Sequence, residues 1–380
     1  MLTIVAIAAI AAWIYLVACR GGFWLAWQRD EDGPYSPTWP TVVAVVPARD
    51  EATGIGQTIT SLLQQDYPGP FSIVVVDDQS SDGTADVARQ AATSSPEQLT
   101  MISGTDLPRE WSGKPWAMKQ GVDKADESAP DYFLFTDADI VYAPETLTRL
   151  VALAQADGLV LNSLMVKLRC ETFAERAFIP AFVFFFQMLY PFAWVSDRAR
   201  RTAAAAGGCM LVRREALAAA GGIETIRGAL IDDCALARAL KPHGSIRLSL
   251  TERAHSIRSY PRMDDIRRMV ARSAYTQLGY SPLMLAGMTA GMAVVYLAPA
   301  LLSLFAHGPV RMLGLLAWAV MTISFLPILR FYRLAPVWAP ALPLIALGYM
   351  AFTLESAYQY ARKRGGLWKG RIQSAANGTR

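Results

Sequence analysis

Short apolar runs alternate with helical segments in the first third of the chain. The runs lie at residues 41–46, 73–76 and 132–135, residues 99–103 are interpreted as a further strand, and the helical segments lie at residues 58–65 and 85–92. Runs that are apolar at every position are typical of strands buried on both faces, and their alternation with helices is typical of a parallel sheet. The pattern therefore predicts an α/β domain with a mostly parallel sheet.

Four other segments are uncharged over nearly the length that a membrane span requires, which is about 20 residues. They lie at residues 1–19, 283–306, 312–329 and 334–354. The first has no basic start and no small-residue cleavage site after it, so we interpret it as an anchor rather than a removed signal peptide. Between these segments, residues 40–275 are predicted to form a water-soluble domain, and residues 355–380 a basic tail.

Basic residues beside the apolar segments predict on which side the domain lies. Arg20 and Arg29 follow the first segment and nothing basic precedes it, so the positive-inside rule predicts a cytoplasmic domain. Three full spans after the domain would place the basic tail outside, which the same rule disfavours. Either the tail breaks the rule, or one segment crosses incompletely; we favour residues 334–354, which contain three prolines.

Composition narrows the class of function. The chain has 380 residues, 53% of them hydrophobic, and a net charge of +4, so there is no strong case for binding nucleic acid. The four cysteines have no metal-ligand spacing and the three histidines are scattered. We therefore expect free thiols, and neither a histidine metal site nor a Ser-His-Asp triad.

Residues 178–195 are apolar and aromatic but are interrupted by Pro180, Gln187 and Pro191. Buried core and a membrane span are both possible. We favour an element at the bilayer surface beside the active site, where a lipid substrate can reach the catalytic centre.

Polar clusters follow the predicted strands. They are Arg49, Asp50 and Glu51 after the first strand, Asp77 and Asp78 after the second, and Asp137 and Asp139 after the fourth. Ligands of open parallel sheets bind outside the carboxyl ends of the strands, so the clusters predict one site. Two aspartates one residue apart at a strand's exit can hold a divalent cation against phosphate oxygens.

Three further motifs carry candidate chemistry. Lys114 beside Gly113 suits contact with a phosphate, although a surface lysine between packed tryptophans is the alternative. Gly207 and Gly208 permit close approach of backbone to a ligand, although a plain β-turn explains them too. Asp232 and Asp233 precede a predicted helix, where one can be a general base and the other a helix cap; we favour Asp233 as the base, although the sequence barely separates them.

Arginines crowd the segment before the second apolar stretch. They are Arg258, Arg262, Arg267, Arg268 and Arg272. Binding of a diphosphate and binding of anionic lipid headgroups are equally good interpretations of this cluster, and they are compatible with each other.

The ordered motifs PARDE, VVDDQSSDGT, WSGKPWA, TDAD, GGCMLVRREAL and DDCALA resemble those of family 2 glycosyltransferases with the GT-A fold, over roughly residues 40–275. With the terminal apolar segments, the chain is most similar to the bacterial hopanoid-biosynthesis-associated glycosyltransferases. A wider relation is to ceramide glucosyltransferase-like enzymes.

The resemblance implies a role for each motif. On the donor side, Pro47, Arg49 and Glu51 would line the nucleotide site, and Asp78 with Asp77 would contact uracil. Lys114 would meet the diphosphate, and Asp137 and Asp139 would bind Mg²⁺ or Mn²⁺. Asp233 would be the catalytic base, and Gly207, Gly208 and Asp232 would lie on the acceptor side. Many relatives carry a Gln-x-x-Arg-Trp motif before the membrane segments, which is absent here. The diphosphate-binding arginine is therefore either Arg268 or Arg272, and a processive polymerase is disfavoured.

These expectations combine into one hypothesis, a multi-pass protein of the bacterial inner membrane that transfers a sugar from a UDP-sugar to a lipid hydroxyl with inversion. The hopanoid acceptor rests on resemblance alone. A polyprenyl phosphate acceptor is the alternative within the same class, and a membrane scaffold or sugar-nucleotide sensor is the alternative without catalysis. The sugar and the oligomeric state stay open.

Overall fold

The computed structural model describes residues 1–30, 38–362, 367–368 and 371–372. The chain forms two compact units. The sheet unit is built from Gln28–Arg169, Trp194–Arg258 and Gly366–Arg380, and the helical unit from Met1–Trp27, Cys170–Ala193 and Ser259–Gly365. The predicted domain boundary at residue 275 therefore differs from this division, and most of the predicted basic tail lies outside the described residues.

The described part of the sheet unit contains an eight-stranded sheet in the order β3-β2-β1-β4-β7-β6-β8-β5. The strands are β1 (Val42–Ala48), β2 (Phe71–Asp77), β3 (Leu99–Ser103), β4 (Tyr132–Phe135), β5 (Ile140–Tyr142), β6 (Leu159–Lys167), β7 (Met210–Arg213) and β8 (Ser245–Ser256). β1 to β4 pair in parallel, as do β6 and β8, whereas β7 and β5 run antiparallel to their neighbours. The predicted α/β fold with a mostly parallel sheet is confirmed.

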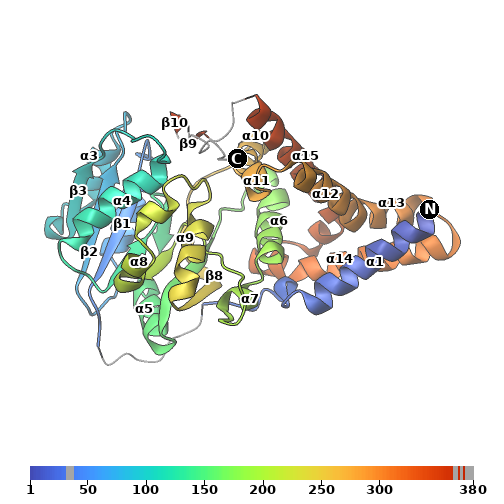
Figure 1. Ribbon diagram of the computed structural model, residues 1–380, viewed down its shortest axis with the longest axis horizontal. Helices are drawn as coiled ribbons and strands as arrows, with labels where there is room; N and C mark the ends of the chain where they lie inside the picture. The colour runs from blue at the N-terminus through green and yellow to red at the C-terminus, as the bar shows by residue number, and fades with distance from the viewer. Residues whose placement is uncertain (31–37, 363–366, 369–370, 373–380) are drawn as a thin grey trace. The chain divides into compact units, whose positions relative to one another are not determined.

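Helices alternate with these strands. They are α2 (Ile55–Leu63), α3 (Thr84–Ala91), α4 (Gly113–Asp126), α5 (Thr146–Ala156), α8 (Arg214–Ala219) and α9 (Asp232–Leu240), with short 3₁₀ turns at Pro96–Gln98, Ile223–Ile226 and Lys241–His243. α7 (Phe192–Ser196) comes at the return of the chain from the helical unit. Figure 1 shows β1 and β2 side by side, with α4 lying across them.

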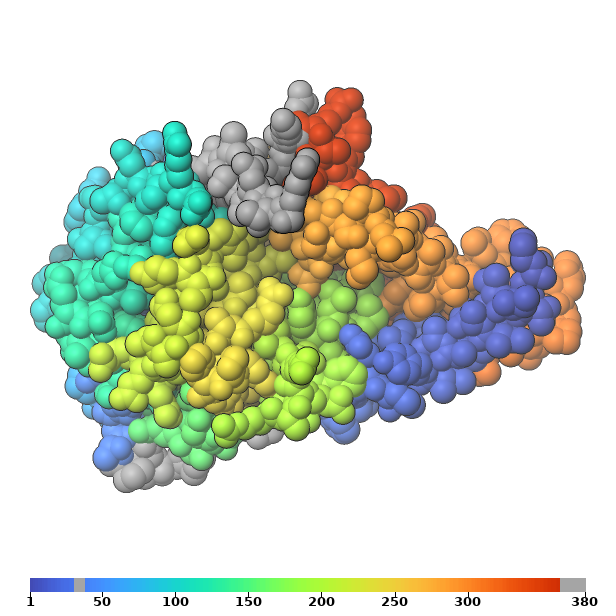
Figure 2. All heavy atoms as spheres, viewed as in Figure 1, coloured from blue at the N-terminus to red at the C-terminus, as the bar shows by residue number. Residues whose placement is uncertain are grey.

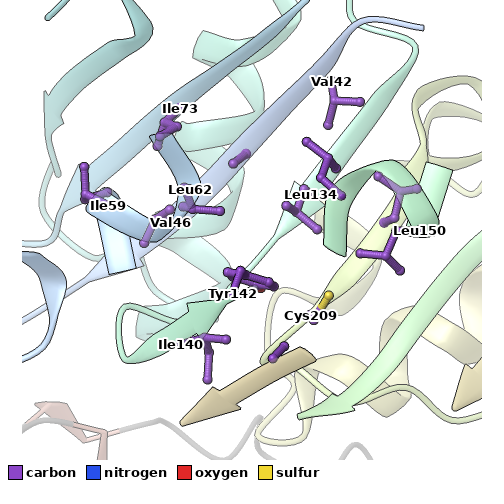
Figure 3. Close-up of a cluster of buried hydrophobic side chains, with 14 of the residues drawn as sticks. Val42, Val46, Ile59, Leu62, Ile73, Leu134, Ile140, Tyr142, Leu150 and Cys209 are labelled. Carbon is purple, nitrogen blue, oxygen red and sulfur yellow. The ribbon is translucent and has the colours of Figure 1, made fainter. Parts of the chain in front are cut away.

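Helices cover both faces of the sheet, which explains why its central strands are apolar throughout. Val42 and Val46 of β1 join a buried cluster with Ile59 and Leu62 of α2 (Figure 3). The alternate residue Val45 points to the other face, where α4 packs. A Cβ added at Gly121 of α4 would lie 2.4 Å from Val45 Cγ1, so glycine is required for this close approach. Burying each such side chain stabilises the fold by roughly 1.5–3 kcal/mol.

The helical unit contains the long apolar helices. Its elements are α1 (Leu2–Cys19), a 3₁₀ turn (Phe23–Leu25), α6 (Phe173–Leu189), α10 (Met263–Ala271), α11 (Ala274–Gln277), α12 (Pro282–Met292), a π-helical turn (Ala293–Leu297), α13 (Ala298–Phe305), α14 (Gly308–Phe331), a 3₁₀ segment (Pro336–Ala341) and α15 (Leu342–Ala361). In Figure 2, α1 (blue) lies along the orange helices of the same unit, consistent with its packing on α13 and α14.

Four helical stretches are long and apolar enough to cross a membrane. They are Leu2–Cys19, Pro282–Phe305, Gly308–Phe331 and Pro336–Ala361, and they match the four predicted segments. The fourth combines the 3₁₀ segment with the regular helix α15. All four stretches are long and apolar enough for a full span. Incomplete crossing by residues 334–354 therefore stays a prediction.

The aromatic segment predicted at residues 178–195 is formed mainly by α6, with α7 following after Pro191. Phe178 packs against Tyr349 and Phe352 of α15, and Phe184 is fully buried against Phe325 of α14. This side of α6 is therefore buried core of the helical unit. The position of the segment at a bilayer surface stays a prediction.

Candidate active site

The polar clusters meet at one edge of the sheet because their strands are parallel and in register. Ala48 at the end of β1 pairs with Asp77 at the end of β2, and Phe135 at the end of β4 pairs with Val45. The residues that follow these strands therefore emerge together. β7 is antiparallel to β4, with Met210 opposite Phe135, so the loop that precedes β7 arrives at the same edge.

Lys114 lies at the centre of the carboxylates. It belongs to the first turn of α4, and its Nζ lies 2.7 Å from Asp137 Oδ1 and 3.2 Å from Asp232 Oδ2. Burial lowers the pKa of Lys114, but the charges of Asp137 and Asp232 more than offset this effect and raise it above its usual value. The side chain is therefore a fixed cation that joins the Asp137 motif to the start of α9.

Asp233 is held by two backbone donors. Gly207 N donates to its Oδ2 at 2.9 Å, and Cys234 N donates to its Oδ1 at 2.6 Å. Burial and the charge of Asp232 raise the pKa of Asp233 to about 6, against the opposing effect of Lys114. A carboxylate with this pKa is ionised at neutral pH and is more basic than an ordinary aspartate, as general-base catalysis requires.

Gly207 is placed where a side chain would intrude on the site. A Cβ at this position would lie 3.1 Å from Lys114 Nζ and 3.5 Å from Asp233 Oδ2. The next residue, Gly208, lies against Val166, which a Cβ would approach to 2.8 Å. The first glycine thus lets backbone contact the candidate base, and the second lets the loop pack on β6.

Asp139 is bound by the segment that follows β8. Its Oδ2 accepts from Ser256 Oγ at 2.9 Å and from Arg258 Nε at 2.9 Å. The same guanidinium donates through Nη2 to Glu51 Oε1 at 2.6 Å. Arg258 therefore connects the cluster after β1 with the cluster after β4.

The two aspartates of the predicted metal motif suit a divalent cation by their remaining oxygens. Asp137 Oδ2 and Asp139 Oδ1 have no hydrogen-bond partner among the described residues. Burial raises the pKa of Asp137, with Asp139 adding to the shift and Lys114 opposing it, and a cation would relieve this cost. No cluster of three or more His, Cys, Asp or Glu ligands exists in the described part of the chain. The pair thus fits Mg²⁺ or Mn²⁺ shared with phosphate oxygens and water.

The predicted nucleotide residues lie at the ends of β1 and β2. Arg49 Nη1 donates to the backbone oxygen of Asp78 and lies 3.7 Å from its carboxylate. Asp77 Oδ1 accepts from Ser80 N at 3.1 Å. Asp78 is 0% exposed, and Pro47 is buried within β1. Asp78 and Pro47 offer no exposed surface to a nucleotide in this structure, so direct contact of these two residues with a nucleotide stays a prediction.

Two predicted arginines lie outside the sheet unit. Arg268 and Arg272 belong to the helical unit, where Arg268 pairs with Asp264 and Asp265. Arg272 is exposed and forms no ion pair with the described residues. Their role in binding diphosphate stays a prediction.

The prediction that Asp232 caps the helix is wrong. α9 begins at Asp232 itself, its N-cap is Ile231, and no side chain makes a capping hydrogen bond. Asp232 instead faces Lys114. The attraction of a buried ammonium outweighs one hydrogen bond to a helix terminus, because both charged groups are shielded from water.

The sequence did not predict that Ser256 and Arg258 contact Asp139. Arg258 was grouped instead with arginines expected to bind a diphosphate or lipid headgroups. Residues 246–256 contain a usable signal: apolar Ile246, Leu248 and Leu250 alternate with polar residues, as in a strand. The pairing of this strand with β5, which follows Asp139 directly, is a long-range feature that one sequence does not contain.

Comparison with known proteins identifies relatives of part of the chain. The family described as Glycosyl transferase family 2 matches residues 43–221. An N-acetylglucosaminyltransferase of Mesorhizobium japonicum is 28% identical over 194 residues, which are 49% of this chain and 42% of that protein. A 4,4'-diaponeurosporenoate glycosyltransferase of Staphylococcus aureus is 33% identical over 120 residues, 30% of this chain and 29% of that protein. The matched regions span less than half the length of these curated relatives.

A solved structure extends the likeness to almost the whole chain. The mannosyltransferase PcManGT from Pyrobaculum calidifontis, in complex with GDP-Man and Mn²⁺, has a TM-score of 0.57 at 20% identity, covering 95% of this chain and 99% of that one. At this identity the likeness concerns the fold. The fold is GT-A-like, and the family model supports a relation to glycosyltransferase family 2 over residues 43–221.

Proposed function

We propose that the protein is a membrane-bound, inverting glycosyltransferase that moves a sugar from a nucleotide-diphosphate donor to a lipid hydroxyl. The observation that carries this proposal is the position of Asp233. Its carboxylate is held by Gly207 N and Cys234 N, has a pKa raised to about 6, and lies beside the cation Lys114. A base and a phosphate-binding cation are thus adjacent at the carboxyl ends of the strands.

In this proposal Asp233 accepts the proton of the acceptor hydroxyl as its oxygen attacks the anomeric carbon of the sugar. The bond from that carbon to the diphosphate breaks in the same in-line displacement, so the configuration inverts. Asp233 is the one base required, unlike the two carboxylates of glycoside hydrolysis. The two backbone donors hold the carboxylate in place and keep it ionised near neutral pH.

Lys114 is placed to receive the leaving diphosphate. Its ammonium is held by Asp137 and Asp232 and stays charged, because those carboxylates raise its pKa. When bound at Asp137 and Asp139, Mg²⁺ or Mn²⁺ would neutralise charge on the departing diphosphate. The mannosyltransferase with the shared fold was solved with Mn²⁺ and a nucleotide sugar, which supports a divalent ion here.

The donor is proposed to be a UDP-sugar. This choice follows the resemblance of the Asp77-Asp78 motif to uracil-contacting motifs. The fold relative contains GDP-Man instead, so a comparison of the two nucleotides belongs in the first assay.

The acceptor is proposed to be a lipid with a free hydroxyl, and a hopanoid is our specific candidate. Four helical stretches that can span a membrane and a relative named for a lipid-like acceptor, diaponeurosporenoate, support this class. We place the protein in the bacterial inner membrane with the sheet unit in the cytoplasm, as the basic residues around the first apolar segment suggest.

The test is transfer by purified full-length protein. Detergent-solubilised protein is incubated with a panel of UDP- and GDP-sugars, Mn²⁺ and a bacterial lipid extract, and the lipids are analysed by mass spectrometry. We expect one donor to yield a glycosylated lipid, and chelation of the metal to abolish the product. The proposal would be contradicted if no new lipid formed and no donor was consumed.

Substitution of the base separates the two acceptor classes. Asp233→Asn should lower turnover at least 100-fold if the acceptor is a neutral hydroxyl, since general-base catalysis contributes about 10²–10⁴. The matched control is Asp123→Asn, an exposed aspartate of α4 paired with Lys119, which should transfer normally. An Asp233→Asn variant with normal turnover would favour a polyprenyl phosphate acceptor, which is already anionic.

A further inference from the structure

Arg258 is bonded to carboxylates from two different motifs of the candidate site. Its Nε lies 2.9 Å from Asp139 Oδ2, and its Nη2 lies 2.6 Å from Glu51 Oε1. The carboxylate side chains are 10% and 13% exposed, and the Arg258 side chain is 34% exposed. Each carboxylate is thus largely withdrawn from water, and the guanidinium offers the fixed geometry that two such partners need.

The backbone fixes where Arg258 lies. β8 pairs antiparallel with β5, with Ile140 opposite Ser256, and Ile257 N donates to the backbone oxygen of Asp139 at 2.9 Å. Arg258 N in turn donates to Ser256 Oγ at 3.2 Å. The pairing of β8 with β5 therefore holds Arg258 against the Asp139 carboxylate.

Ser256 and Arg258 direct their donors to the same oxygen of Asp139. Both hydrogen bonds end on Oδ2, and Oδ1 has no partner among the described residues. The carboxylate therefore has one oxygen committed to the protein and one available to a ligand. Such outer contacts orient the groups that bind a metal and commonly change metal affinity 10- to 100-fold.

We propose that Arg258 is a positioning residue, which fixes the Asp139 carboxylate so that it offers a single oxygen to a divalent cation and ties it to Glu51. The inference rests on the proposed metal-dependent transfer but concerns a residue that no motif of the resemblance contains. Arg258 is not a free guanidinium, because its Nε and Nη2 are engaged by Asp139 and Glu51.

The orienting bonds of Arg258 and its positive charge should have opposite effects on metal affinity. A positive charge beside the site repels a divalent cation, so its removal would strengthen metal binding if charge dominated. Removal of the bonds frees Asp139 to rotate and leaves two largely buried carboxylates close together, which weakens binding if orientation dominates. Two substitutions distinguish these cases: Arg258→Lys keeps the charge and loses the fork, and Arg258→Gln loses both.

The matched control is Arg253, which lies on β8 five residues before Arg258. Its guanidinium also joins two carboxylates, with Nη1 2.7 Å from Asp30 Oδ2 and Nε 3.3 Å from Glu145 Oε1, and its side chain is 27% exposed. Arg253→Lys and Arg253→Gln therefore disturb a comparable arrangement that contains neither Asp137 nor Asp139.

The experiment measures Mn²⁺ binding to full-length protein without donor, by the loss of the free-ion electron paramagnetic resonance signal. The site is identified as the binding that Asp139→Asn removes. We expect both Arg258 variants to bind Mn²⁺ at least 10-fold more weakly, Ser256→Ala to bind a few-fold more weakly, and the Arg253 variants to match wild type. In transfer assays at saturating Mn²⁺, Arg258→Lys should lower kcat more than it raises the KM for donor.

Two outcomes would overturn the inference alone: unchanged Mn²⁺ affinity in Arg258→Lys, or tighter binding in Arg258→Gln. A wild-type protein without Mn²⁺ binding that depends on Asp139 would instead overturn the proposed metal site itself, and this inference with it. A variant that fails to fold is recognised by its melting temperature, and Ser256→Ala then tests the same orientation through a smaller change.

Discussion

Replacing Asp233 with asparagine should stabilise the protein at alkaline pH while removing its transfer activity. The reason is that burial and Asp232 raise the pKa of this carboxyl from 3.8 to about 6. A carboxyl whose pKa is higher in the folded state destabilises that state when ionised. The cost is absent below the unfolded-state pKa of 3.8, grows between the two pKa values and is complete above about pH 6.

The magnitude follows from the shift. A difference of about two pKa units corresponds to about 3 kcal/mol, since one unit is worth about 1.4 kcal/mol. Asparagine removes this cost but has one acceptor oxygen for the two donors, Gly207 N and Cys234 N. Loss of one such bond costs about 1–2 kcal/mol. The expected net gain at pH 8 is therefore about 1–2 kcal/mol.

The pH dependence is the sharper quantity because the lost hydrogen bond affects both pH values equally. At pH 5 the ionisation cost in wild type falls to roughly half its full value. The stability of Asp233→Asn relative to wild type should therefore fall by about 1–1.5 kcal/mol between pH 8 and pH 5.

The assay is thermal unfolding of the detergent-solubilised protein, followed by tryptophan fluorescence at both pH values, with Asp123→Asn as the exposed control. The control should show no difference between the two pH values. A stability difference for Asp233→Asn that is the same at pH 5 and pH 8 would refute the assignment of a raised pKa to Asp233.

Three further predictions follow from the same contacts. Transfer should decline as the pH falls through about 6, because protonated Asp233 cannot accept a proton; a flat pH–rate profile between 5 and 8 would contradict this. Lys114→Met should raise the KM for donor, yet bind Mn²⁺ more tightly than wild type without donor, because the ammonium no longer pairs with Asp137; transfer kinetics measure the first and calorimetric titration the second, and weaker Mn²⁺ binding would contradict the second. Gly121→Ala should lower the free energy of unfolding by about 1–3 kcal/mol, because its Cβ would lie 2.4 Å from Val45 Cγ1; an unchanged denaturation midpoint would show that α4 packs less closely.

The fold was predictable where the signal is local. β1, β2 and β4 contain continuous apolar runs between turn residues, β3 is of mixed polarity, and the structure has strands at all four predicted positions. Their carboxyl-end clusters could be located for the same reason, because parallel strands bring their ends together. The four long apolar helices required only length and composition.

The rest depends on pairings between distant segments. β5 has three residues and is defined by β8, more than 100 residues later in the chain. Arg258 meets Asp139 only through that pairing, so its position at the start of a cluster of arginines was misleading. Asp232 resembled a helix cap in sequence, whereas its partner Lys114 comes from another helix. α6 was ambiguous because burial against protein and burial against lipid select the same apolar residues.

Because β7 is antiparallel to β4, the candidate site combines segments that follow strands with a segment that precedes one. Arg49, Asp77 and Asp137 follow the exits of parallel strands, whereas Gly207 precedes the entrance of β7, and the two kinds of segment meet because Met210 lies opposite Phe135. In the proposed mechanism, the residues on the donor side therefore come mainly from the first 140 or so residues, and those on the acceptor side from the loops before β7 and α9. The arrangement is modular: exchange of those loops between relatives should change the acceptor while the nucleotide preference is inherited intact.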